Sequence, residues 1–164
     1  MLTFLTGGAR SGKSSLAVRM AGSSDGAVVF LATARPEGDD EWHERLARHR
    51  AERPAGWTTV EEPVELVSAI ETAPAGAAVV VDCVSLWVAN VLESDVEALN
   101  ERAVAAAQQR ARAIVVSNEV GLGIVPVSQL GRRYRDVLGR VNAQWAAAAD
   151  EAVLVVAGKM LRLQ

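Results

Sequence analysis

The sequence predicts an α/β fold in which helices cover both faces of a mostly parallel β-sheet. Short, continuous apolar runs alternate along the chain with longer segments of helical periodicity, which is the pattern of strand–helix–strand units. The runs are rich in valine, as is typical of strands that are buried on both faces. Neither a repeat nor a long linker interrupts this alternation, so we expect residues 1–164 to form a single domain.

Runs of apolar and β-branched residues predict the strands. Glycine, proline or a polar loop bounds each run, and the run that ends in Asp82 is the most apolar. The expected strands are residues 2–5, 27–32, 57–61, 77–82, 113–117 and 152–156. The residues after 156 match no pattern that we can interpret.

The segments between these runs predict the helices. The helix after Gly38 starts with Asp39, Asp40 and Glu41, whose charges suit the positive end of a helix dipole, and it stops before Pro54. The expected helices are residues 16–21, 39–52, 64–72, 85–92, 96–112 and 128–149, with a turn at 22–26.

The residues that join the first strand to the first helix, Gly7 to Ser14, match the phosphate-loop pattern G-x-x-x-x-G-K-[ST]. Glycines let successive backbone N–H groups point at one anion, and the following helix adds its positive end. Lys13 is expected to reach the β- and γ-phosphates, and the Ser14 hydroxyl to bind Mg²⁺. The alternative is a glycine-rich turn that only ends a strand, which the flanking strand and helix disfavour. The sequence therefore predicts a fold of the P-loop NTPase type.

Asp82 closes the most apolar strand, in the manner of a Walker B acid. A charge directly after buried residues is costly unless it meets a cation. In P-loop proteins such an acid holds Mg²⁺ beside the serine of the loop, so Ser14 and Asp82 are the predicted metal ligands. The alternative is an aspartate that only caps the helix at 85–92.

His49 lies in the helix at 39–52 among four arginines, at positions 45, 48, 50 and 53. Nearby cations disfavour the protonated imidazole. A neutral imidazole can attack phosphorus, while guanidinium groups hold the oxygens of the displaced group. The spacing alone leaves a surface or packed histidine equally open. His43 falls on a different part of the helix surface and is the weaker candidate nucleophile.

Two other features keep two interpretations each. Glu119 lies in a glycine-containing loop that either approaches a ligand or only connects two elements. The arginines at 132–140 either face phosphates or form a solvated helix face. Cys83 is interpreted as a small buried hydrophobe rather than a reactive thiol.

Composition excludes several classes of function. The net charge of −3 provides no basic field for DNA or RNA. A single cysteine excludes a disulfide framework and a cysteine-rich metal site. No apolar run approaches the roughly 20 residues that span a bilayer, and no signal peptide is visible. We therefore expect a cytoplasmic protein without nucleic-acid partners.

Taken together, these segments resemble the bifunctional adenosylcobinamide kinase/adenosylcobinamide-phosphate guanylyltransferase enzymes of cobalamin assembly, over essentially the whole chain. The resemblance rests on T-G-G-A-R-S-G-K-S at 6–14, A-T-A at 32–34, D-D-E at 39–41, R-L-x-x-H-R-x-x-R-P-x-x-W-x-T-x-E at 45–61, S-N-E-V-G-x-G-I-V-P at 117–126 and G-R-V-N-x-x-x-A-A-A-A-D at 139–150. The histidine-containing segment and the segment at 117–126 are far more specific than the phosphate loop.

The resemblance implies two reactions. ATP or GTP phosphorylates adenosylcobinamide, and GTP then transfers GMP to that phosphate through a guanylylated histidine, with release of pyrophosphate. The family's histidine falls on His49, which with Lys13 forms the expected catalytic pair. The expected nucleotide contacts are Thr6, Gly7, Gly8, Ala9, Arg10, Ser11, Gly12, Lys13, Ser14, Ala32, Thr33, Ala34, Arg50, Ala51, Glu52, Arg53, Glu61 and Asp82. A homo-oligomer is also implied, with a trimer as the expected form.

Two other functions are compatible with the phosphate loop. One is a P-loop kinase of a small molecule, without a guanylyl step and with a structural His49. The other is a non-catalytic switch that binds a nucleotide tightly, for which the chain offers no additional interaction domain.

Overall fold

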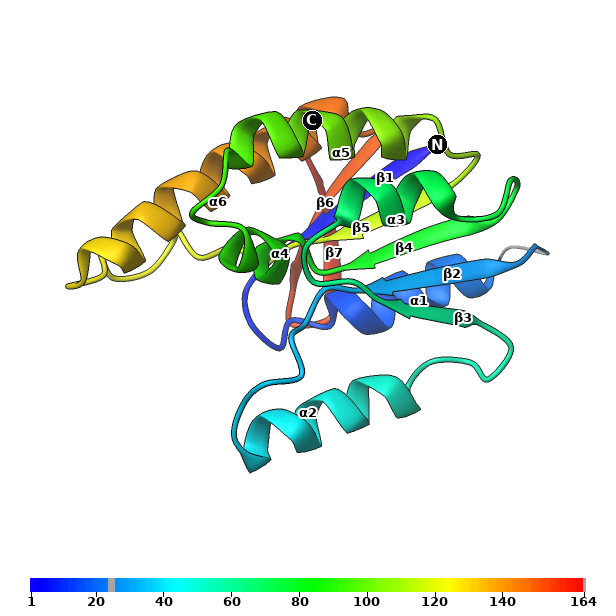
Figure 1. The fold of residues 1–164 in the computed structure, drawn as a ribbon, viewed down its shortest axis with the longest axis horizontal. Coiled ribbons are helices and arrows are strands. Elements are labelled where there is room, and N and C mark those ends of the chain that lie inside the picture. Colours follow the sequence, from blue (N-terminus) through cyan, green and yellow to red (C-terminus); the bar gives the residue numbers. More distant parts are fainter. Residues whose placement is uncertain (24–25, 164) are drawn as a thin grey trace.

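The computed structural model describes residues 1–23 and 26–163 and, within them, every side chain except that of Arg45. These residues form a seven-stranded sheet in the order β3-β2-β4-β5-β1-β6-β7 (Figure 1). Pairing is parallel from β3 across to β6, and the edge strand β7 runs antiparallel to β6. The strands are β1 (Leu2–Thr6), β2 (Val28–Ala32), β3 (Thr58–Glu61), β4 (Ala78–Asp82), β5 (Ala113–Val116), β6 (Glu151–Val156) and β7 (Lys159–Leu163).

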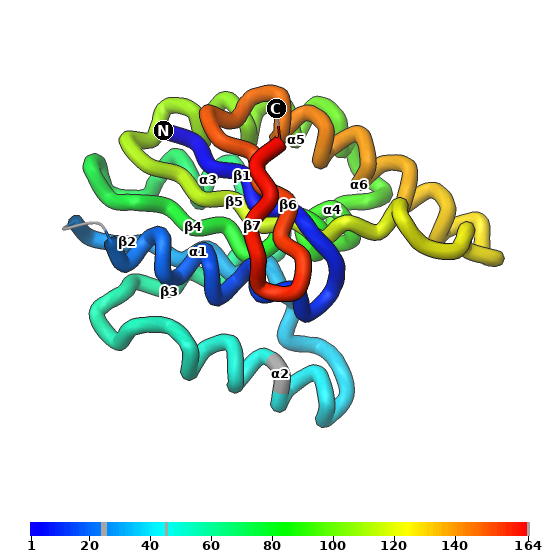
Figure 2. The backbone as a smooth tube through the Cα atoms, turned by 180° about the vertical axis from the view of Figure 1, so that it is seen from behind, coloured from blue at the N-terminus to red at the C-terminus, as the bar shows by residue number. Residues whose placement is uncertain are grey.

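Helices pack on both faces of the sheet, as the sequence predicts. Successive strand residues point to opposite faces, so in β4 Val79 and Val81 join the core beneath α3 to α6, and Val80 joins the core beneath α1. Helix α2 covers neither face and stands apart from the sheet beyond β3 (Figures 1 and 2). The helices are α1 (Lys13–Gly22), α2 (Asp40–Ala51), α3 (Leu66–Thr72), α4 (Val84–Asn90), α5 (Val96–Gln108) and α6 (Gln129–Ala148).

Strand β7 is the one described element that the sequence does not predict. It folds back on β6 through Ala157 and Gly158, both of which have a positive φ, 51° and 75°. That conformation is typical of a two-residue hairpin turn, which usually carries asparagine or glycine at its first position. Alanine there weakens the sequence signal, and for this reason the hairpin is not evident from the sequence.

Element boundaries differ from the prediction by a few residues. The helix expected at 96–112 ends at Gln108, and the chain then turns so that Arg110 donates to the carbonyl oxygen of Ala73, 3.0 Å away. The helix expected at 16–21 begins earlier, at Lys13. Residues 24 and 25 of the expected turn at 22–26 lie outside the described residues.

The β6–β7 hairpin supports the glycine-rich loop that follows β1. The backbone N–H of Gly158 donates to the carbonyl oxygen of Ser11 at 2.9 Å. Gly7 is buried against β6 with φ of 150°, and a Cβ atom there would lie 2.2 Å from the carbonyl oxygen of Val155. Only a residue without a side chain fits at this position, so β6 sets the course of the loop.

Replacing Gly7 with alanine is expected to destabilise the protein, because either β6 or the loop would have to move. Backbone strain and overpacking each cost about 1–3 kcal/mol, so we expect a loss of about 2–4 kcal/mol in the free energy of unfolding. Gly8→Ala is the matched control, since an added Cβ meets nothing within 4 Å and should change the stability by less than about 0.5 kcal/mol. Denaturant melts of both variants test this, and equal effects would contradict it.

Candidate nucleotide-binding and catalytic site

The carboxyl ends of four adjacent strands meet at one edge of the sheet. Ala32 of β2 pairs in register with Glu61 of β3 on one side and with Asp82 of β4 on the other, and Asp82 pairs with Val116 of β5. The glycine-rich loop leaves β1, the next strand along, at the same edge. In open α/β sheets ligands bind at this edge, and the register therefore brings the predicted site residues together.

A cavity of about 520 Å³ lies between this edge and α2. Its wall combines the glycine-rich loop, the strand ends and one side of α2. Most of the predicted nucleotide contacts line it: Ala9, Arg10, Ser11, Gly12, Lys13, Ser14, Ala32, Ala34, Arg50, Glu52, Arg53, Glu61 and Asp82. Thr6, Gly7, Gly8, Thr33 and Ala51 are not among the lining residues.

The start of α1 is arranged as an anion site. Gly12 precedes the helix with φ of 98° and contributes no side-chain cap, so the first N–H groups of α1 remain directed out of its end. The Lys13 side chain is only 6% exposed, and its ammonium group donates to the carbonyl oxygen of Gly8 at 2.7 Å and to Ser11 Oγ at 3.3 Å. The lysine charge is thus held over the loop.

Asp82 opens onto the cavity but is otherwise enclosed by protein. This enclosure raises the pKa of the Asp82 carboxyl, against the opposing effects of a hydrogen bond from Ser14 and of the charges on His49, Arg53 and Lys13. The surrounding positive charge therefore does not fully compensate the carboxylate, and an added cation would do so.

The donor set suits Mg²⁺. Ser14 and Asp82 offer a hydroxyl and a carboxylate oxygen, and both residues line the cavity. The described residues contain no group of three or more histidine, cysteine, aspartate or glutamate side chains that could hold a metal ion by themselves. Mg²⁺ typically binds through one or two protein oxygens together with phosphate and water, so this sparse set fits the ion.

His49 is half-buried on α2 and lines the cavity opposite the loop. His49 lies near enough to Asp82 to influence the pKa of that carboxyl, so the two side chains belong to one site. His43 is not among the lining residues, and its ring forms a hydrogen bond with the carbonyl oxygen of Pro36 at 2.9 Å. This confirms that the two histidines of α2 lie on different parts of its surface.

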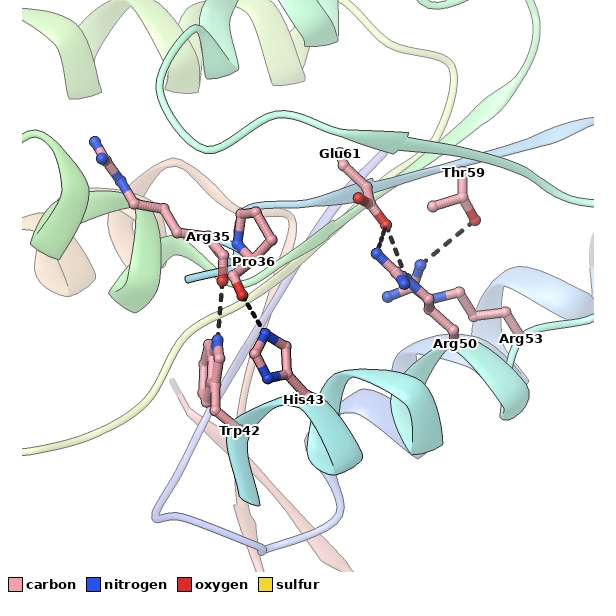
Figure 3. A network of polar contacts seen from close by, with 8 residues as sticks. All are labelled: Arg35, Pro36, Trp42, His43, Arg50, Arg53, Thr59 and Glu61. Carbon is pink, nitrogen blue, oxygen red and sulfur yellow. Dashed lines mark hydrogen bonds and ion pairs between the residues drawn. The ribbon is translucent and has the colours of Figure 1, made fainter. Parts of the chain in front are cut away.

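Helix α2 is held mainly at its ends, as Figure 3 shows. At its start, the side chain of Asp39 caps the helix and Trp42 Nε1 donates to the carbonyl oxygen of Arg35 at 2.9 Å. At its end, Arg50 forms an ion pair with Glu61, and the guanidinium group of Arg53 lies 4.1 Å from the centre of the Phe30 ring. None of the described side chains of α2 is buried, so polar contacts rather than core packing fix its position.

The structure gives several predicted residues other partners. Thr33 is fully buried; its hydroxyl donates to the carbonyl oxygen of Cys83 at 2.7 Å and accepts from the Cys83 N–H at 2.9 Å, so it braces the strand end that carries Asp82. Burial lowers the pKa of the Arg53 guanidinium, which donates to Thr59 at 3.5 Å. These contacts cross between strands and could not be seen from spacing.

Contacts within the protein favour a structural role for the features that kept two interpretations. The arginines of α6 bond to protein groups outside the cavity: Arg132 to the carbonyl oxygens of Pro126 and Val127, Arg133 to Glu93, Arg135 to Asp136 and Arg140 to Glu97. Glu119 belongs to a turn, since its carboxylate accepts from the N–H of Gly121. Cys83 is buried, as expected of a small hydrophobe, and burial raises the pKa of its thiol to about 11.

Two asparagines for which the sequence predicts no role contribute to the site, one by joining its loops and the other by lining the cavity. Asn90 donates to the carbonyl oxygens of Thr33, at 2.8 Å, and Pro63, at 3.0 Å, and so joins the loops after β2 and β3. Asn118 lines the cavity directly after β5. Its position at the carboxyl end of a predicted strand was the signal that could have identified it.

Two solved structures share the fold. The flagellar accessory protein FlaH from Methanocaldococcus jannaschii superposes with a TM-score of 0.55 at 13% identity, over 97% of this chain and 74% of that chain. An ATPase from the type III secretion system of pathogenic bacteria gives a TM-score of 0.57 at 9% identity, over 93% and 51% of the two chains. At these identities the likeness shows the fold alone, which is that of the P-loop ATPases.

Sequence relatives match over the full chain. The bifunctional adenosylcobalamin biosynthesis protein CobP of Pseudomonas aeruginosa is 42% identical over 173 residues, covering 100% of this chain and 98% of that protein. The corresponding CobU protein of Escherichia coli is 41% identical over 177 residues, covering 96% and 97%. Residues 3–163 match the family described as cobinamide kinase / cobinamide phosphate guanyltransferase. The phosphate loop, the acid on β4 and the histidine on α2 thus occur in a chain that belongs to the cobinamide kinase / cobinamide phosphate guanyltransferase family.

Proposed function

We propose that this protein carries out both reactions for which its family is named: ATP or GTP phosphorylates adenosylcobinamide, and GTP then transfers GMP to the new phosphate, giving adenosylcobinamide-GDP. The observation that carries the proposal is that His49 lines the same cavity as Lys13, Ser14 and Asp82. A triphosphate gripped by the loop would lie in a cavity that a histidine also faces.

In the kinase step the acceptor hydroxyl attacks the γ-phosphorus of the nucleotide. A bond forms between the hydroxyl oxygen and γ-phosphorus, the bond from γ-phosphorus to the β–γ bridging oxygen breaks, the nucleoside diphosphate leaves and the hydroxyl proton passes to water. The loop N–H groups and Lys13 would hold the β- and γ-phosphates while charge shifts onto the leaving oxygen.

In the guanylyl step a ring nitrogen of His49 attacks the α-phosphorus of GTP. A nitrogen–phosphorus bond forms and the bond from α-phosphorus to the α–β bridging oxygen breaks, releasing pyrophosphate. A phosphate oxygen of adenosylcobinamide phosphate then attacks the same phosphorus and displaces the imidazole. Two displacements, each with a good nucleophile, replace a direct reaction between two anions.

Ser14 and Asp82 would hold Mg²⁺, which would offset the negative charge of the phosphates in both steps. The enclosed carboxylate of Asp82 supports this role, because the raised pKa indicates that its ionised form lacks compensating charge.

A structural role for His49, as in a kinase without guanylyl transfer, is the competing function. Among the residues that the structure describes, His49 has no hydrogen-bond or ion-pair partner that would indicate such a role. His43 on the same helix has one, at Pro36. This contrast favours the two-step function.

The two steps cut bonds at different phosphorus atoms, so the nucleotide or α2 has to shift between them. We propose that α2 moves as a unit about Gly38 and Pro54, the residues at its two ends. Its weak attachment, with no buried side chain among those described, supports this motion.

We also propose a cytoplasmic homo-oligomer, with a trimer as the expected form. Large apolar side chains are exposed between β5 and α6, including Leu122 at 85%, Ile124 at 95% and Val127 at 97%. Contiguous exposed apolar surface is typical of protein–protein contacts.

The nucleotide substrates and the free thiol of Cys83 support the proposed cytoplasmic location. None of the described helices is long and apolar enough to cross a membrane.

Incubation with GTP labelled at the α-phosphate is expected to give a labelled protein that is acid-labile and base-stable, as a phosphoramidate is. His49→Ala should abolish the label, because the attacking nitrogen is lost. His43→Gln is the matched control, since this histidine lies outside the cavity lining, and it should keep the label. A labelled His49→Ala protein would exclude the two-step mechanism.

Asp82→Asn is expected to stabilise the ligand-free protein while lowering phosphoryl transfer by about 100-fold or more. Because the pKa of Asp82 is raised on folding, the wild type loses stability as pH rises from the ordinary aspartate pKa through the raised value. The asparagine variant does not, so the difference in Tm should be absent in acid and should grow with pH across that window. Thermal melts of the exposed Glu101→Gln variant serve as the control. A Tm difference that is independent of pH would contradict this assignment.

GTP is expected to slow amide hydrogen exchange severalfold in α2, as the helix closes on the nucleotide, and to leave α5 unchanged. Exchange followed by mass spectrometry on Asp40–Ala51 and Val96–Gln108 measures both helices in one experiment. Unchanged exchange in α2 at saturating GTP would rule out the motion.

A further inference from the structure

Asn118 follows β5 between the two parts of the site that handle phosphate. Val116 of β5 pairs with Asp82 of β4 on one side and with Leu5 of β1 on the other. Two residues further, Asn118 lines the cavity. The backbone around it is fixed, since the N–H of Ser117 donates to Leu5 and the N–H of Glu119 donates to Gly7, each at 2.9 Å. Asn118 is therefore held between the acid and the phosphate loop.

Buried contacts fix the orientation of the Asn118 amide. Its Nδ2 donates to Ser85 Oγ at 2.9 Å, and Ser85 is fully buried. Tyr134 holds Ser85 in turn by donating its hydroxyl to the Ser85 carbonyl oxygen at 2.9 Å, and burial raises the pKa of Tyr134 to about 12, which keeps that donor protonated. Asn142 Nδ2 donates to the Asn118 carbonyl oxygen at 3.0 Å. Nδ2 is thus engaged by buried Ser85, and no hydrogen bond among the described residues occupies Oδ1, which leaves this oxygen as an acceptor on a residue that lines the cavity.

We propose that Asn118 positions the acceptor alcohol in the kinase step, through a hydrogen bond from the attacking hydroxyl to Oδ1. This inference rests on the proposed function. A neutral amide accepts a hydrogen bond but takes no proton. Asn118 therefore aims the hydroxyl oxygen at γ-phosphorus, and the proton passes to water once the new oxygen–phosphorus bond has formed and the bond to the nucleoside diphosphate has broken. Alignment of this kind is most of what a protein supplies to phosphoryl transfer.

Sheet order assigns Asn118 to one of the two reactions. Glu61 and its partner Arg50 lie beyond β2, on the β3 side of Asp82, and α2, the helix to which His49 belongs, stands on that side as well (Figure 1). Asn118 lies on the other side of Asp82, next to the loop that grips the β- and γ-phosphates. We therefore assign guanylyl transfer, at the α-phosphate, to the loosely attached helix α2. Phosphoryl transfer, at the γ-phosphate, is assigned to residues held by the rigid sheet.

Asn118→Leu tests the assignment, because leucine has nearly the same shape and lacks the acceptor. We expect kcat for phosphorylation of adenosylcobinamide to fall by about 10- to 100-fold. Labelling of His49 by GTP in the absence of corrinoid, and the Kd for the nucleotide, should stay within about twofold of wild type. Asn118→Ala, measured in the same way, guards against a packing effect of leucine. Glu119→Gln, whose side chain lies outside the cavity lining, should keep all three wild-type values.

Equal losses of phosphorylation and of His49 labelling in both variants would show that Asn118 only supports the fold, and unchanged phosphorylation would show that it does not touch the acceptor. Either result overturns the inference while the wild type still makes adenosylcobinamide phosphate. If the wild-type protein makes none, the proposed function itself is wrong, and the role of Asn118 falls with it.

Discussion

The enclosed carboxylate of Asp82 is the constraint on which the rest of the site depends. It lies at the end of the most apolar strand, and its desolvation is opposed by Ser14, His49, Arg53 and Lys13 together. Those groups come from the phosphate loop and from α2 with the turn that follows it, segments that the sheet brings together only because β2, β4 and β1 all end at one edge. A carboxylate that the protein compensates incompletely is unfavourable in the free protein, and the proposed Mg²⁺ would offset its charge. The proposed binding of a cation is thus coupled to the desolvation of the Asp82 carboxylate.

The two walls of the cavity differ in rigidity for a physical reason. The sheet wall is made of strands whose alternate side chains are buried in two cores, and Thr33, Asn90 and Asn118 tie its loops together through hydrogen bonds with buried partners. Helix α2 buries none of its described side chains and is held by caps and ion pairs. The groups that the proposed reactions keep in one position are on the first wall, and His49, the proposed nucleophile, is on the second.

The sequence predicted those features of the site that depend on residues close to one another in the chain. The phosphate loop, Asp82 and His49 follow from a motif, a strand end and a cluster of charge, each readable within a few residues. The roles of Thr33 and Asn118 depend on partners 50 and 33 residues away in the chain, which spacing cannot reveal. Strand β7 was missed because its turn begins with Ala157, a residue that rarely adopts positive φ. The arginines of α6 kept two interpretations, phosphate ligands or a solvated face, only while their partners, such as Glu93 and Glu97, were unknown.

The ion pair between Arg50 and Glu61 would allow one cavity to accept the different phosphates of the proposed reactions. Both side chains are about half exposed, 53% and 48%, and such pairs contribute at most about 1 kcal/mol. A phosphate group can therefore replace Glu61 as the partner of Arg50 at little cost, and guanidinium binds phosphate and carboxylate through the same two-pronged geometry. Arg53 differs, since its guanidinium lies over the Phe30 ring and its burial lowers its pKa, so it stays with the sheet. If α2 moves, Arg50 is the arginine that can leave its partner and follow the nucleotide, while Arg53 marks the end about which the helix turns.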